Sequence, residues 1–147
     1  MEYKKGNIGR VFIVRIDHGD DLLEELEKLA KLENIESASM VLLGAVIKGK
    51  LVTGPKENIV PPDPIWAEFD NVNEVVGVGN IFTEDGVPKI HLHTAAGDRD
   101  GNAVVGCLRG SSEIFMVVEV LILELTGMSA SRMFDSSIGY SRLRFEQ

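Results

Sequence analysis

Residues 114–125 read IFMVVEVLILEL, a stretch in which apolar side chains occupy both alternating faces of a potential strand. Only Glu119 and Glu124 interrupt it. Because successive side chains of a strand point to opposite sides of a sheet, a strand of this composition should be covered on both sides. We expect the cover to come from the protein core or from a neighbouring subunit.

The clearest helix is predicted for residues 21–34, where leucines recur at the spacing of one helical face. Asp20 and Asp21 suit the positively charged N-terminal end of that helix. Strands are expected where β-branched and aromatic residues gather, at residues 10–16, 39–46, 50–53, 66–69, 75–82, 89–94 and 103–108. Strands outnumber helices without a regular alternation of the two, which indicates an α+β fold.

Glycines and prolines mark the connections between these strands. Two glycines predict a turn, and therefore a hairpin, between residues 39–46 and 50–53. Residues 54–64 hold four of the five prolines, so we expect a surface loop there. Trp66 follows directly and is predicted to pack this loop onto the core.

Composition and charge limit the classes of protein to consider. The 147 residues suit a single domain, residues 1–147, and the net charge of -8 argues against a broad electrostatic grip on nucleic acid. The single cysteine, Cys107, excludes an internal disulfide framework and suits a reducing cytoplasm. No apolar segment approaches the ~20 residues needed to span a bilayer, so we expect a cytoplasmic protein and no membrane partner.

The most informative chemical motif is His91-Leu92-His93. On a strand, both imidazoles lie on one face with their Cα atoms roughly 7 Å apart, which permits them to share a metal ion. A hairpin could bring Cys107 alongside as a third ligand and leave a fourth position open. The alternative is that Cys107 is a small buried hydrophobe and that the histidines make ordinary hydrogen bonds, and spacing alone slightly favours it.

Several short motifs together resemble the plants and prokaryotes conserved (PPC) domain over nearly the whole chain. They are Gly79-Asn80-Ile81, Gly86-x-Pro88, His91-Leu92-His93 and Gly106-Cys107-Leu108, with support from Arg15, Gly19-Asp20-Asp21-Leu22, Gly44-Ala45 and Glu119. The resemblance implies a mainly antiparallel sheet, a homotrimer, and a cluster of histidines near a subunit boundary.

One position departs from that family, because Cys107 stands where the resemblance implies a third histidine. Zinc accepts a thiolate as readily as an imidazole, so the exchange conserves the coordination chemistry. We therefore predict a divalent metal site, with zinc as the expected ion and with His91, His93 and Cys107 as ligands. A family activity that needs the third imidazole as an acid or base would be lost.

Four further residues are considered in relation to this site. His18 is expected to be a solvent-exposed turn residue. Glu113 and Glu119 could be carboxylate ligands or general bases, or they could be ion-pair partners at an interface. Arg15 is the candidate partner for such a pair.

Three functions are compatible with these features. The first is a metal-dependent enzyme acting on a small molecule, although no catalytic residue can be named. The second is a DNA-associated or regulatory module that acts through protein partners. PPC domains in plant proteins accompany AT-hooks, and this acidic chain lacks a hook, so tight direct binding to duplex DNA is not expected. In the third, the metal is purely structural.

Overall fold

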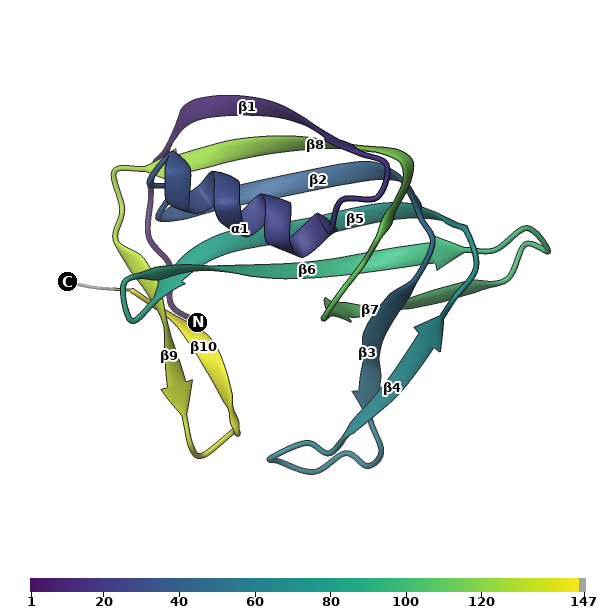
Figure 1. Cartoon of the computed structure of the whole chain (residues 1–147). Helices are drawn as coiled ribbons and strands as arrows, with labels where there is room; N and C mark the ends of the chain where they lie inside the picture. Colours follow the sequence, from purple (N-terminus) through teal and green to yellow (C-terminus); the bar gives the residue numbers. More distant parts are fainter. Residues whose placement is uncertain (146–147) are drawn as a thin grey trace.

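The computed structural model describes residues 1–145, which contain ten strands and one helix (Figure 1). In chain order these are β1 (Asn7–Asp17), α1 (Leu22–Leu32), β2 (Ser37–Val46), β3 (Gly49–Pro55), β4 (Pro64–Phe69), β5 (Asn73–Glu84), β6 (Val87–Gly97), β7 (Ala103–Arg109), β8 (Ile114–Thr126), β9 (Ala130–Asp135) and β10 (Tyr140–Phe145). The α+β class and the helix within residues 21–34 are confirmed. Among the described residues, no helix combines the length and apolar character needed to cross a membrane.

The strands form one sheet in the order β1-β8-β2-β5-β6-β7-β3-β4, and every neighbouring pair on this path is antiparallel. The hairpin β9–β10 joins through a short parallel contact between β9 and the end of β5. Figure 1 shows this hairpin and the hairpin β3–β4 extending from opposite ends of the long strands.

The predicted hairpin between residues 39–46 and 50–53 is wrong. Strand β2 pairs with β8 on one side and β5 on the other, whereas β3 pairs with β7 and β4. Both hydrogen-bonding edges of β2 are thus occupied by long strands that pair along nearly its whole length. The seven-residue β3 is left to pair at the far end of the sheet.

Helix α1 covers one face of the sheet and closes the core (Figure 1). Its buried residues, Leu22, Leu26 and Ala30, follow the predicted helical spacing. Burying each of these leucines contributes about 1.5–3 kcal/mol. Asp21 is the N-cap, and its carboxylate accepts hydrogen bonds from the backbone N–H groups of Leu23 and Glu24.

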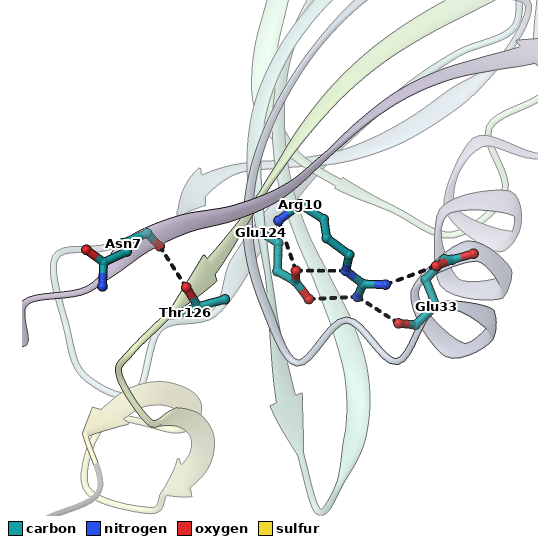
Figure 2. A network of polar contacts seen from close by, with 5 residues as sticks. All are labelled: Asn7, Arg10, Glu33, Glu124 and Thr126. Atoms are coloured by element: carbon teal, nitrogen blue, oxygen red, sulfur yellow. Dashed lines mark hydrogen bonds and ion pairs between the residues drawn. The ribbon is translucent and has the colours of Figure 1, made fainter.

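Arg10 ties the C-terminal end of α1 to the sheet, as Figure 2 shows. A bulge at residues 9–10 of β1 precedes the regular pairing with β8. The Arg10 guanidinium donates to both carboxylate oxygens of Glu124 on β8, at 2.9 and 2.7 Å. It also donates to the backbone carbonyl of Glu33, the C-cap of α1, at 2.8 Å. One exposed side chain therefore connects two strands and a helix end.

The opposite face of the sheet has no covering layer within the described chain. Ile13, Leu121, Val41 and Val78 stand directly opposite one another across β1, β8, β2 and β5, so their side chains share this face. Ile13 is 79% exposed and Val78 is 64% exposed. We call this surface, which also includes Val11, Leu43 and Val76, the open face. Residues 1–145 thus cover one side of residues 114–125, and cover of the other side by a neighbouring subunit stays a prediction.

The proline-rich connection between β3 and β4 is an exposed loop, as predicted. The predicted packing of Trp66 onto the core is wrong. Trp66 lies on the edge strand β4 and is 47% exposed. The ammonium group of Lys50 lies 4.9 Å from the centroid of its ring, so the indole faces a cation instead of the core.

Candidate metal centre

Strands β6 and β7 bring together the three residues that the sequence singles out. His91 and His93 lie two positions apart on β6, and Cys107 on β7 stands directly opposite His93. The potential ligand atoms of all three residues lie within 4.8 Å of one another. The side chain of His93 is exposed, that of His91 is partly buried, and that of Cys107 is buried, with 6% of its surface exposed.

A close approach of β7 to β3 positions Cys107. A Cβ atom on the preceding residue, Gly106, would lie 2.4 Å from the backbone oxygen of Val52. Cys107 is itself the register partner of Val52. Only glycine permits the two backbones to come so near at this point, directly before Cys107.

The two imidazoles are hydrogen-bonded to each other, which agrees with the alternative raised from the sequence, and the same spacing also suits tetrahedral coordination. Their Nε2 atoms are 3.2 Å apart. Two nitrogens bound tetrahedrally to one zinc ion at the usual bond length would be about 3.3 Å apart. The same geometry places a thiolate sulfur about 3.6 Å from each nitrogen, and the 4.8 Å limit on the present separations means that Cys107 needs at most a small shift to reach that position.

Arg132, on β9, is the immediate neighbour of His91. Its Nη2 lies 3.2 Å from Nδ1 of His91 and 2.7 Å from Oδ1 of Asn80. Because a guanidinium can only donate hydrogen bonds, Nδ1 of His91 must be the acceptor. The proton of the neutral ring is then on Nε2, which is the nitrogen that faces His93.

The surroundings of His91 and Cys107 favour their uncharged forms. Burial, the largest cause, acts together with the nearby charges of Arg132, His93 and Arg109 to lower the pKa of His91 from 6.5 to about 4. Burial also raises the pKa of the Cys107 thiol, against the opposing effect of Arg109 and Arg132. A metal ion would therefore have to displace a proton from the thiol.

His18 lies outside this cluster and has a structural role. Its Nδ1 accepts a hydrogen bond from the backbone N–H of Met116 at 3.2 Å. Met116 has a φ of 60° and lies where β8 bulges away from β2. The exposed turn histidine that was predicted thus stabilises an irregular stretch of β8.

The two glutamates considered as ligands also lie outside the cluster. Glu113 forms an ion pair with Lys48 at 2.9 Å. Glu119 is exposed and stands opposite Arg15 in the pairing of β1 with β8. Within residues 1–145, Arg15 forms an ion pair with Asp17 at 2.9 Å, and a pair between Arg15 and a glutamate across a subunit interface stays a prediction.

Arg132 is the residue that sequence reasoning missed. It follows His91 by 41 positions, and no local pattern marks it. It reaches His91 only because β9 runs parallel to the end of β5, with Arg132 opposite Glu84.

A family model for the Plants and Prokaryotes Conserved (PCC) domain matches residues 3–126. The chain belongs to this family, which confirms the resemblance seen in its motifs. The matched region includes His91, His93 and Cys107 but ends before the hairpin β9–β10.

Solved structures share the fold along nearly the whole chain. A metal-containing protein from Archaeoglobus fulgidus is 27% identical, covers all of both chains and has a TM-score of 0.86. A plant- and prokaryote-conserved protein from Pyrococcus horikoshii is 24% identical over 97% of each chain, with a TM-score of 0.82. A proposed DNA-binding protein from Ralstonia eutropha JMP134 is 24% identical over 91% of this chain and 90% of that one, with a TM-score of 0.77.

One curated relative is much longer. The bifunctional protein GlmU of Synechococcus sp. (strain JA-3-3Ab) is 25% identical over 140 residues, which are 94% of this chain. The chain spans only 21% of the length of that relative.

Proposed function

We propose that this PCC-domain protein binds one zinc ion through His91, His93 and Cys107. The observation that carries the proposal is the 3.2 Å separation of the two histidine Nε2 atoms, close to the spacing in a tetrahedral site. The cysteine stands opposite His93 on the next strand, within reach of the same ion. The metal-containing relative from Archaeoglobus fulgidus adds support at the level of the family.

The donor set favours zinc over harder ions. Two imidazoles and a thiolate suit zinc, whereas magnesium and calcium prefer oxygen ligands. Three protein ligands leave a fourth position, which is the arrangement of many catalytic zinc sites. A zinc ion there could polarise a carbonyl group or activate water, so a metal-dependent enzyme acting on a small molecule is the first candidate role.

A second candidate role is that of a DNA-associated or regulatory module acting through protein partners. The name of the Ralstonia relative is the observation that favours it. The net charge of -8 argues against direct binding to duplex DNA, so a partner would have to supply the contact. We rank the enzyme ahead of the regulatory module because a zinc ion held by three protein ligands would keep one coordination position for water or substrate.

The open face supports the proposal of a homotrimer. Its apolar side chains line a groove of about 330 Å³ that includes Ile13, Val41 and Leu43. A contiguous apolar surface of this kind marks an interaction site more often than a free surface. The row of residues on it continues through Val78 to His93, so subunits that cover this face would meet next to the candidate metal centre. We also expect the cytoplasm as the compartment, since it would keep the Cys107 thiol reduced.

Elemental analysis of protein purified without an affinity tag tests the metal proposal. We expect about one zinc per chain in the wild type and a loss of most of it in His91→Ala and in Cys107→Ala. His18→Asn is the matched control, because it changes a histidine outside the cluster and keeps an acceptor for the Met116 N–H. Wild-type protein that holds no zinc after incubation with the ion would refute the site.

A further inference from the structure

A pocket of about 340 Å³ lies beside the candidate metal centre, where the hairpin β9–β10 meets β6 and β7. Its lining includes five ionisable side chains, Glu84, Lys89, His91, Arg109 and Arg132, and the hydroxyl groups of Tyr140 and Ser141. We call it the hairpin pocket. Its volume lies in the range of pockets that hold small organic ligands.

The hairpin pocket is positively charged in a chain of net charge -8. Lys89, Arg109 and Arg132 contribute three cations, and none of them forms an ion pair with another residue between positions 1 and 145. The one carboxylate in the lining, Glu84, accepts a hydrogen bond from the hydroxyl of Ser141. Glu84 attracts Arg132 and so offsets part of this charge. Three cations still outnumber the one carboxylate, and a recess with an excess of positive charge attracts anions.

Arg132 also has donor capacity that the rest of the described chain does not use. Its Nη groups donate to Asn80, to His91 and to the backbone oxygen of Ser141. Its buried Nε–H has no acceptor among the described residues. An unsatisfied buried donor on a charged group is costly, and a small turn of the guanidinium toward an anion would satisfy it.

We propose that the hairpin pocket binds the oxyanion, a phosphate or a carboxylate, of a small organic molecule. Arg132, Arg109 and Lys89 hold the oxyanion, and the remainder of the molecule extends toward His91 and His93. That orientation rests on the proposed zinc site, whereas the binding of the oxyanion does not. The family model ends at residue 126, so Arg132 and Tyr140 lie outside it and the pocket is partly built from residues beyond the family match.

The test uses metal-free protein, so that it does not depend on zinc. NMR spectra of the amides are recorded during titration with inorganic phosphate and, separately, with acetate, at constant ionic strength. We expect saturable shifts in the pocket residues. Lys89→Gln and Arg109→Gln, which change exposed side chains, should each weaken binding about three- to tenfold. Arg99→Gln, in the turn that follows β6, is the matched control and should bind as the wild type does.

The outcomes separate this proposal from the zinc site. Saturable shifts that Lys89→Gln weakens and Arg99→Gln does not would support the pocket, whatever the zinc content. Stronger binding of phosphate than of acetate would identify a phosphate ligand, and the reverse a carboxylate. Protein that takes up zinc but shows no saturable shift with either anion would overturn the pocket and leave the zinc site intact. Equal weakening in Arg99→Gln would also overturn it, because binding would then be nonspecific.

Discussion

The guanidinium of Arg132 approaches Nδ1 of His91 to 3.2 Å, on the side of the ring where a metal-binding histidine usually has a hydrogen-bond acceptor. A histidine that binds zinc through Nε2 carries its proton on Nδ1 and donates it. Arg132 cannot accept that proton. The contact seen here and zinc binding through Nε2 of a neutral His91 are therefore in competition.

The first prediction concerns this competition. Arg132→Gln should tighten zinc binding about tenfold, because the amide oxygen of glutamine can accept the Nδ1–H and a positive charge is removed. Competition with a chromophoric chelator measures the affinity. Arg142→Gln is a suitable control, since Arg142 is engaged with Asp135 on the same hairpin. An unchanged or weaker affinity in Arg132→Gln would contradict the proposed competition between the Arg132 contact and zinc binding.

The second prediction concerns acid stability of the metal-free protein. The pKa of His91 is about 4 in the folded chain and 6.5 as a free group, so protons bind the unfolded chain more readily. The stability that the neutral His91 ring contributes is complete above the unfolded-state pKa of 6.5, and it is lost as the pH falls toward the folded-state pKa of about 4. Linkage gives at most about 2 kcal/mol of destabilisation at about pH 5, and solvent at the half-buried ring reduces this to about 1 kcal/mol.

Urea unfolding of the metal-free protein, compared at about pH 7.5 and about pH 5, measures this loss. His91→Asn should reduce the pH dependence by that amount, because asparagine does not titrate. An NMR titration of the His91 ring should give a midpoint near 4. A midpoint near 6.5 would show that the ring is more hydrated than the structure indicates.

The third prediction uses the residue that distinguishes this chain from the family resemblance. Cys107→His should still bind zinc, since it supplies a third imidazole. In the wild type, zinc affinity should rise about tenfold per pH unit above about pH 7.5, because burial raises the thiol pKa and zinc must displace its proton. The variant should lose most of that slope. Equal slopes would mean that the thiol is not a ligand.

The fourth prediction concerns the open face. Val41→Asp places a charge in the middle of the apolar row and should convert the expected trimer into monomers, which sedimentation velocity would detect. Leu32→Asp is the control, because Leu32 is an exposed leucine at the end of α1, away from that row. A wild-type monomer at high concentration would contradict the trimer, and an unchanged trimer in Val41→Asp would place the interface elsewhere.

Local periodicity explains which sequence predictions were confirmed. The spacing of Leu22 and Leu26 predicted α1, and the alternation of a strand predicted that His91 and His93 share one face. Two predictions failed because they depended on strand order. The link between β2 and β3 looks locally like a hairpin, but β2 pairs with β8 and β5 instead of with β3. Trp66 looks locally like a core anchor, but it lies on the edge strand β4.

The sequence by itself determined the helix, most of the strands and the pair of histidines, because the backbone period decides these within a few neighbouring residues. Tertiary structure alone decided that Cys107 stands opposite His93, that Arg132 approaches His91, and which face of β8 stays open. These three relationships join residues that are distant in the chain. They depend on strand register and on the order of strands in the sheet. Both are decided by which side chains the whole core buries, and no local pattern in the sequence reveals that.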